Sequence, residues 1–303
     1  FFKTMIALHL LICLGIQNGS AQNLGGTDFW FTFPLNFSLG PGGTQGTNQI
    51  VLVSSCAVSG QYSFPALAGA PVNFTITPGV TTVIDLPANN NTLPEAVQNN
   101  AIHITGDSRM AAYAVDYLPF SVDGDTLLPT TSLGTNYVLQ GYASTGGNRS
   151  SQYTIFATQN ATTITITTPV DLSTDAGTTT SHAAGSTFNI TLNAGQTYML
   201  SAKAPPSTIS SVSGTQVSAN KPFGVITHTP CSDYICTSCD ILMSQPLPTN
   251  MLGTKYITAQ SQARFGAGDH LQVTAGAGGS SYTFNSQQFP MPPSVCEVHM
   301  PLP

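Results

Sequence analysis

The chain has 303 residues, of which 41% are hydrophobic and 7% are charged, and its formal net charge is −6 at pH 7. This length allows two small domains, and this hydrophobic content is enough to build cores, which excludes a disordered chain. Charged residues usually make up about a quarter of a domain, so the polar surface here must come from uncharged residues. Phosphate binding needs clustered Lys and Arg, and no such cluster is visible, which argues against a nucleic-acid partner.

Residues 1–21 resemble an export signal. Lys3 gives the positive flank, residues 5–16 form an apolar run of about a dozen residues, and residues 19–21 are small enough for cleavage. An apolar run of this length is too short to span a membrane comfortably. We therefore expect a secreted or cell-surface, extracellular protein without a membrane span. The first residue is Phe1 rather than Met, which suggests an incomplete reading frame.

The rest of the chain shows strand patterns and no convincing helical periodicity. Apolar and polar residues alternate in residues 29–33, 74–77, 102–105, 153–156 and 162–167. Such alternation is typical of antiparallel strands that bury one face. Gly and Pro interrupt the strands about every eight to twelve residues, as in sandwiches and barrels. We predict an all-β fold made of tandem antiparallel β-sandwich modules that resemble jelly rolls.

The chain also repeats itself. Residues 128–137 return as residues 247–256 with seven of ten positions identical, and residues 73–79 match residues 189–195. A repeated unit of about a hundred residues is too long for a solenoid and suits a small β-domain. The predicted fold is therefore internally duplicated.

These patterns divide the chain into four parts after the leader. Residues 22–47 form an N-terminal strand region and a Gly-rich linker, residues 48–146 form β-module one, and residues 147–266 form β-module two. Residues 267–303 begin a third module and end in a Pro-rich tail. Because that third module is incomplete, we expect either a fragment of a longer chain or strands supplied from elsewhere.

Cysteine usage leaves two interpretations open. An oxidising compartment favours disulfides. The alternative is a zinc site in which Cys231, Cys236 and Cys239 are joined by Cys296 or His228. An odd number of cysteines follows the leader, so one is free or pairs with another chain, and the connectivity stays open. The disulfide candidates are Cys56, Cys231, Cys236, Cys239 and Cys296.

An acidic loop in module one is a second candidate site. Asp123 and Asp125 flank a glycine and could hold calcium, but no bidentate Glu follows at the spacing of a calcium loop. An Asp-Gly turn is the better interpretation, so we expect no metal and no cofactor. If the chain recognises a partner, this loop and the cysteine loop of module two are the first candidates. The recognition candidates are Asp116, Asp123, Asp125, His228, Asp233 and Asp240.

Six asparagines stand in the Asn-x-Ser/Thr pattern that accepts N-linked glycans. The pattern also arises by chance in a chain this rich in Asn and Thr. If it is used, these asparagines lie on the surface of a glycoprotein. They are Asn36, Asn73, Asn90, Asn148, Asn160 and Asn189.

Catalysis is not expected. No Gly-x-Ser-x-Gly elbow stands at a strand-to-helix turn. The only two glutamates are Glu95 and Glu297, which leaves a glycosidase carboxylate pair without support. We assign no catalytic residue.

A series of motifs carries a resemblance to a known family. It comprises residues 26–33, 101–107, 133–137, 156–166, 192–198, 217–225, Cys231 and Cys239-Asp240, in this order. The ordered set, which covers about residues 26–259, is similar to the N-terminal domain of IgG Fc-binding proteins. Related domains occur in mucus proteins of animals and in large secreted bacterial surface proteins. The chain departs from the family at Cys236, which is extra, and at residues 241–243, where an acidic and His pattern is absent.

Two functions follow from these expectations. The first is a non-catalytic, adhesion-type recognition protein that binds a glycan, a glycoprotein or an immunoglobulin-like partner. The second is a subunit that polymerises into an extracellular, glycan-coated filament, because a strand from one subunit can complete an open β-module in the next. A head-to-tail contact that does not close gives a filament.

Overall fold

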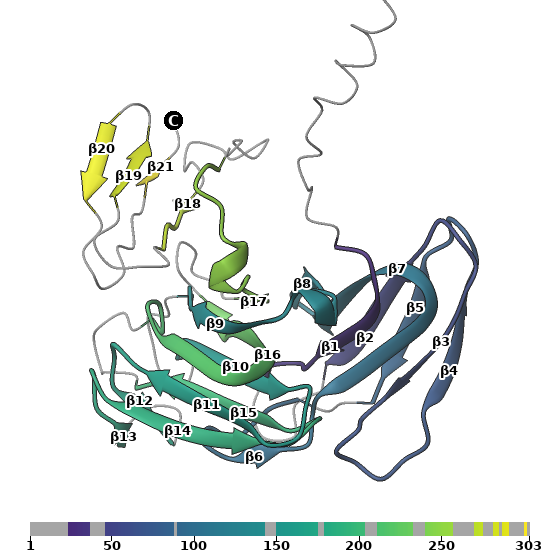
Figure 1. Cartoon of the computed structure of the whole chain (residues 1–303), viewed down its shortest axis with the longest axis horizontal. Coiled ribbons are helices and arrows are strands. Elements are labelled where there is room, and N and C mark those ends of the chain that lie inside the picture. Colours follow the sequence, from purple (N-terminus) through teal and green to yellow (C-terminus); the bar gives the residue numbers. More distant parts are fainter. Residues whose placement is uncertain are drawn as a thin grey trace, which may run out of the picture.

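The structure is a computed structural model of the whole chain (Figure 1). It describes residues 24–36, 46–87, 90–142, 150–174, 179–203, 211–232, 240–256, 270–274, 281–284, 287–290 and 300–301. Regular structure in these ranges consists of strands and two short 3-10 turns, η1 (Thr130–Ser132) and η2 (Thr249–Met251). None of the described residues forms a helix long and apolar enough to cross a membrane, and the predicted leader lies outside them. The predicted all-β fold class is confirmed.

The first sheet has seven strands arranged around one long strand, β7. The first half of β7 pairs with β1 and β3, and its second half pairs with β2 and β8. β4 extends the sheet beyond β3, and β5 extends it beyond β2. Figure 1 shows β7 as one long, curved strand that runs through the first sheet. The strands are β1 (Gly26–Phe31), β2 (Thr47–Val53), β3 (Val58–Ser63), β4 (Val72–Ile76), β5 (Thr82–Leu86), β7 (Ile102–Leu118) and β8 (Ser121–Thr126).

The second sheet has ten strands and is built around a second long strand, β16. The first half of β16 pairs with β9 and β11, and its second half pairs with β10 and β17. The strands are β6 (Val97–Gln98), β9 (Gly134–Val138), β10 (Gln152–Ala157), β11 (Thr162–Thr167), β12 (Leu172–Ser173), β13 (Thr180–His182), β14 (Thr187–Leu192), β15 (Thr197–Ala202), β16 (Gln216–Ser232) and β17 (Asp240–Ser244).

Strand register shows that the two sheets are copies of one plan. Gly26 of β1 lies opposite Met110, and Gly134 of β9 lies opposite Phe223, with a register shift nearby in both pairs. Matched turns follow β4 and β14, where Gly79 and Gly195 have φ values of 73° and 83°. Positive φ favours glycine because it has no Cβ. The duplication predicted from the sequence is therefore confirmed in the backbone.

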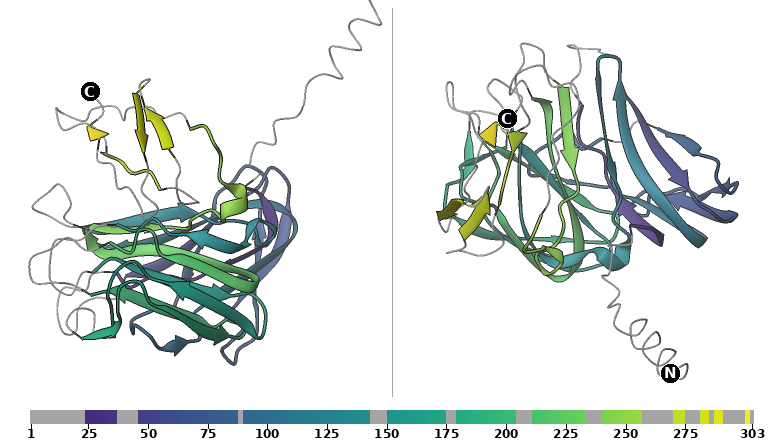
Figure 2. Two further views of the ribbon diagram at one scale, coloured as in Figure 1. Left: turned by 60° about the vertical axis from the view of Figure 1, so that its left-hand side comes forward. Right: turned by 90° about the horizontal axis from the view of Figure 1, so that it is seen from above.

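Strand β9 begins the second copy, as β1 begins the first. It follows β8 and η1 in the chain and pairs with β16 in the ten-stranded sheet. Tyr137 of β9 is only 2% exposed, and its hydroxyl donates to the Phe223 carbonyl at 2.7 Å. β6 instead leaves the first copy and pairs with β15 of the second sheet. Figure 2 shows the two sheets side by side, as this pairing requires.

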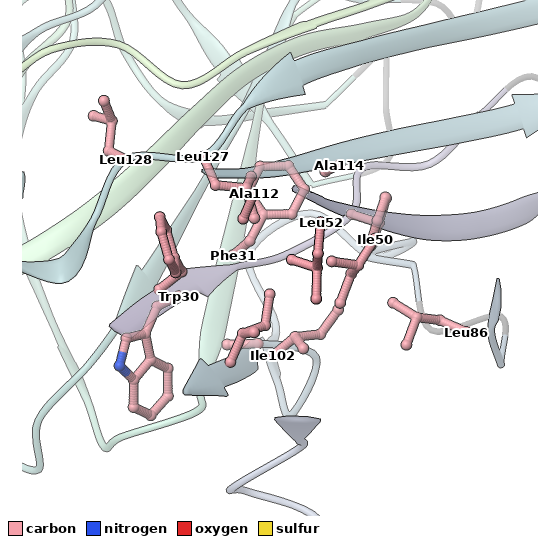
Figure 3. Close-up of a cluster of buried hydrophobic side chains, with 14 of the residues drawn as sticks. Trp30, Phe31, Ile50, Leu52, Leu86, Ile102, Ala112, Ala114, Leu127 and Leu128 are labelled. Carbon is pink, nitrogen blue, oxygen red and sulfur yellow. The ribbon is translucent and has the colours of Figure 1, made fainter. Parts of the chain in front are cut away.

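The structure buries two apolar cores, and the first of them is shared between the two sheets. This core gathers Phe29, Phe31 and Phe33 with apolar residues of β2 and β7, and it also includes residues of the second sheet, namely Phe156, Ile226 and Met243. Figure 3 shows Phe31, Ile50 and Leu52 close together in it. The second core is formed mainly by β10, β11, β15 and β16. Every second residue of a strand points to the same side. β10 and the second half of β16 are buried on both sides, because Ile155 and Val225 pack in the second core while Phe156 and Ile226 pack in the first.

Buried polar side chains connect the N-terminal segment to the second sheet. The Asn91 amide donates to Thr32 Oγ1 at 2.7 Å and to the Phe33 carbonyl at 2.9 Å, and its oxygen accepts from the Thr197 hydroxyl. Asn91, Thr32 and Thr197 are all fully buried. Because buried polar groups are costly unless hydrogen-bonded, this network favours one arrangement of the segment.

Two small sheets lie near the C-terminus. β18 (His270–Leu271) pairs with β21 (Met300–Pro301), and β19 (Ser281–Phe284) pairs with β20 (Gln287–Pro290). These strands belong to the segment that the sequence assigns to the start of a third module, and that assignment stays a prediction.

Candidate recognition surface

The acidic residues predicted to form a recognition loop instead join the two copies. β8 and β17 lie next to each other, and Met243 N–H donates to Asp123 Oδ2 at 2.7 Å. Gln245 N–H donates to Asp125 Oδ2, and Val122 N–H donates in the other direction to Asp240 Oδ1 at 3.0 Å. The carboxylates thus bind the backbone of the neighbouring copy.

Calcium binding by Asp123 and Asp125 would require carboxylate oxygens that are not already hydrogen-bonded. The second oxygens of Asp123 and Asp125 accept from the backbone N–H groups of Gly124 and Thr126, both at 2.8 Å. Burial raises the pKa of both carboxyls, and the backbone hydrogen bonds oppose that rise. All four oxygens already have donors, and no group of three or more metal-ligating side chains occurs in the part of the chain described.

Asp116 lies inside the fold rather than in a loop. It belongs to β7 and is fully buried, and its Oδ1 accepts from the Asn36 amide at 2.9 Å. Burial raises its pKa to about 6, with a smaller increase from Asp123, while the bond from Asn36 lowers it. A partner cannot reach Asp116 at this position.

The bond to Asp116 also corrects the prediction that Asn36 is a surface glycosylation site. Asn36 is buried, and its amide donates to Asp116 and to the Ser121 carbonyl. Its own oxygen accepts from the Ser121 hydroxyl at 2.9 Å. A glycan on Asn36 would have to replace these interior contacts.

The other predicted glycosylation sites differ in exposure. Asn73, Asn160 and Asn189 are exposed, and Asn90 is half-buried. Asn73 pairs with Gln61 in the first sheet, and Asn189 pairs with Thr165 at the corresponding place in the second. Asn148 lies outside the described residues. Three exposed sites thus remain able to carry a glycan.

His228 is buried as well. It lies in β16 with Nε2 at 3.0 Å from Thr154 Oγ1, and Nδ1 has no hydrogen-bond partner. Burial lowers its pKa to about 3, so the ring is neutral at physiological pH. His228 is therefore an interior side chain and not part of a recognition loop.

The two described cysteines are in different states. Cys231 is buried and disulfide-bonded, so it has no thiolate to offer zinc. Cys56 is exposed and free in the bend after β2, contrary to its prediction as a disulfide partner. Cys236, Cys239, Cys296 and Asp233 lie outside the described residues.

Sequence reasoning missed an exposed apolar sheet surface on the first copy. Residues that pair directly across strands share one side of a sheet, and the outward side of β5, β2, β7 and β8 carries two tyrosines and several valines. Four of these side chains, Val83, Tyr113, Tyr117 and Val122, are each more than a third exposed. We call this surface the outer face. Its residues are Thr47, Gln49, Val51, Val83, Asp85, Tyr113, Val115, Tyr117, Val122, Gly124 and Thr126.

Phe120 stands at one end of the outer face. Leu118 pairs with Ser121, so Pro119 and Phe120 form the two-residue loop between β7 and β8. Phe120 is 97% exposed, and its φ is 73°. A bulky residue at positive φ costs on the order of 1–3 kcal/mol. An exposed ring recovers none of that cost by burial, which points to a role outside folding.

The sequence did contain a signal for the outer face. In β7 the small residues Ala112 and Ala114 point inward, while the large residues Tyr113 and Tyr117 point outward. An ordinary half-buried strand places its large apolar residues inside. This reversal marks a strand whose outer side is available for binding.

Comparison with known proteins identifies the family. A sequence model of the family described as "IgGFc binding protein" matches residues 123–295. The human IgGFc-binding protein is 22% identical over 193 residues, which cover 63% of this chain and 3% of the human protein. The chain thus spans a small part of that relative's length, and no solved structure matches it. Because the family match covers more than half of the chain, the chain belongs to the IgGFc-binding protein family.

Proposed function

We propose that the chain is a non-catalytic recognition module of an extracellular protein, and that it binds its partner through the outer face and Phe120. The partner is a glycan, a glycoprotein or an immunoglobulin-like protein. Family membership supports binding as the activity, and the name of the human relative supports an immunoglobulin as one partner. The single observation that carries the proposal is the strained, fully exposed Phe120 beside two exposed tyrosines.

The chemistry of this surface suits protein or glycan recognition. Aromatic residues are enriched at the energetic centres of interfaces because they bury a large area at low entropic cost. Asp116 and His228, two titratable groups with large pKa shifts, are instead fully buried. Buried groups of this kind are out of reach of a substrate.

The test is a binding measurement by surface plasmon resonance against IgG Fc, mucin and other secreted glycoproteins. Phe120→Ser should weaken binding at least tenfold, as expected for an interface anchor. Val80→Ser is the matched control, because Val80 is exposed beyond β4, outside the outer face. Equal affinity for wild type and Phe120→Ser, or no binding to any of these partners at micromolar concentrations, would refute the proposal.

Self-assembly into a filament is the alternative, and one observation favours it. Tyr256 repeats the local geometry of Tyr137, since Gly253 N–H donates to its hydroxyl at 2.8 Å as Gly134 N–H donates to Tyr137 at 3.0 Å. Tyr137 is buried against β16, whereas Tyr256 is 68% exposed. Residues 253–256 thus resemble the first strand of a module, and among the described residues no long strand pairs with them. A strand from another subunit could supply that partner.

Electron microscopy and sedimentation of the secreted chain test this alternative. Filaments that disappear in Tyr256→Ser and persist in Phe120→Ser would establish strand exchange at residues 253–256. Discrete particles in the wild type at all concentrations would rule out assembly.

A further inference from the structure

The geometry of the outer face points to one class of ligand: we infer that it binds a neutral oligosaccharide, such as a glycan chain without sialic acid on a glycoprotein. This inference rests on the proposed function and narrows it from a recognition surface to a sugar-binding one.

The two exposed tyrosines provide stacking platforms. Tyr113 and Tyr117 point to the same side of β7 and are four residues apart, so their Cα atoms are separated by about 13 Å. The face of an aromatic ring is electronegative and attracts weakly positive C–H groups, which a sugar ring presents on its flat side. A separation of this length suits an oligosaccharide better than a single sugar.

A fixed polar pair lies beside the tyrosines. The Gln49 amide donates to Asp85 Oδ1 at 2.7 Å, and these two residues pair across β2 and β5. Gln49 also pairs with Val115, the residue between Tyr113 and Tyr117 in the alternation of β7. Amide and carboxylate oxygens in this position can accept hydrogen bonds from sugar hydroxyls. The outer face thus combines flat apolar rings with oriented acceptors.

The charge of the outer face selects against anionic ligands. None of its residues is basic, and Asp85 places a carboxylate on it. Gly124 lies opposite Val115, the residue between the two tyrosines. Because Gly124 has no side chain, β8 places no bulky group beside Val115. A sialylated or sulfated glycan would meet a like charge without a compensating Lys or Arg.

The experiment uses the full chain on an array of neutral, sialylated and sulfated oligosaccharides, followed by titration calorimetry with the best neutral ligand. The double variant Tyr113→Thr/Tyr117→Thr removes both rings and keeps β-branched residues that suit a strand. Tyr256→Thr removes a tyrosine that lies outside the outer face and is more exposed than either Tyr113 or Tyr117. We expect the double variant to lose at least tenfold in affinity and Tyr256→Thr to lose less than twofold, with thermal unfolding confirming that all variants are folded.

Three results would overturn the inference. The first is unchanged glycan affinity in the double variant, and the second is stronger binding to sialylated or sulfated glycans than to neutral ones. The third is equal binding to IgG Fc before and after enzymatic removal of its N-linked glycan, with no glycan bound on the array. This third result would leave the proposed recognition function standing and assign the outer face to a protein partner. Absence of binding to Fc, mucin and glycans alike would remove both.

Discussion

Asp123 of one copy accepts a hydrogen bond from the backbone N–H of Met243 in the other, over 2.7 Å. In the opposite direction, Asp240 Oδ1 accepts a hydrogen bond from Val122 N–H at 3.0 Å. Two edge strands, β8 and β17, are therefore joined through side-chain carboxylates rather than through a backbone ladder. This pairing also keeps both edges from binding other strands.

Replacing Asp123 by Asn should weaken the junction. Asn has one terminal oxygen, whereas Asp123 accepts from Gly124 and Met243 with two. One N–H donor would lose its acceptor, and the free energy of unfolding in urea at pH 7 should fall by about 1–3 kcal/mol. Asp85→Asn is the control, because its bond from Gln49 needs only one oxygen. Equal stability of the two variants would show that the carboxylate does not hold the copies together.

Asp116 should give the protein a pH-dependent stability. Its pKa is raised from 3.8 to about 6 by burial, so the folded state holds a proton that the unfolded state has lost between about pH 4 and pH 6. Stability contributed by this residue therefore falls as pH rises through that window, by on the order of 3 kcal/mol. Asp116→Asn should remove this fall and be more stable than wild type at pH 7. Urea unfolding at pH 4, 5, 6 and 7 measures the difference, and a difference that does not change with pH would contradict the assignment.

Gly224 should not tolerate a side chain. A Cβ at this position would lie 1.9 Å from Cζ of Phe156, which is fully buried on the neighbouring strand β10. Gly224→Ala should lower the free energy of unfolding by about 1–3 kcal/mol through overpacking. The double variant Gly224→Ala/Phe156→Leu should be less strained at this contact, which a double-mutant cycle would show. Gly69→Ala, where no atom lies within 4 Å, is the control and should change stability by less than about 0.5 kcal/mol.

Asn91→Ala should be among the most destabilising polar substitutions in the chain. It removes partners from buried Thr32 and Thr197 and from the Phe33 carbonyl. Each of these groups keeps one other partner, which is the Asn100 carbonyl, the Gln98 carbonyl and the backbone N–H of residue 91, respectively. Three buried hydrogen bonds are lost at about 0.5–1.5 kcal/mol each, so we expect a total loss of about 1.5–4.5 kcal/mol. Asn136→Ala is the control, because its exposed amide donates only to the adjacent Thr135 hydroxyl. Thermal unfolding that ranks the two variants alike would exclude a structural role for the network.

The sequence predicts the fold well where a pattern is local. The Thr and Ile alternation of residues 162–167 becomes β11, and the matched segments at Asn73 and Asn189 occupy corresponding positions in β4 and β14. Such regularities depend on the side-chain period of a strand and on turn residues, which neighbouring residues determine.

Contacts between distant residues were not predictable in the same way. Asp123 and Met243 are 120 residues apart, and Asp116 needs Asn36 from a different segment, so neither role can be read from local spacing. Local spacing therefore predicts an exposed acidic loop. The packing of β8 against β17 instead places these residues at the junction between the two copies. The outer face contains no polar or cysteine motif, and its local signal is only the size reversal at Ala112 and Tyr113.

Hydroxyl-radical footprinting of the chain, free and bound to its partner, would show whether the outer face is the recognition surface. We expect protection of Tyr113, Tyr117 and Phe120 on binding, with Tyr256 and Leu93 as exposed side chains that stay reactive. Unchanged reactivity of all three residues in a complex that forms, with protection elsewhere on the chain, would contradict the assignment of the outer face as the recognition surface.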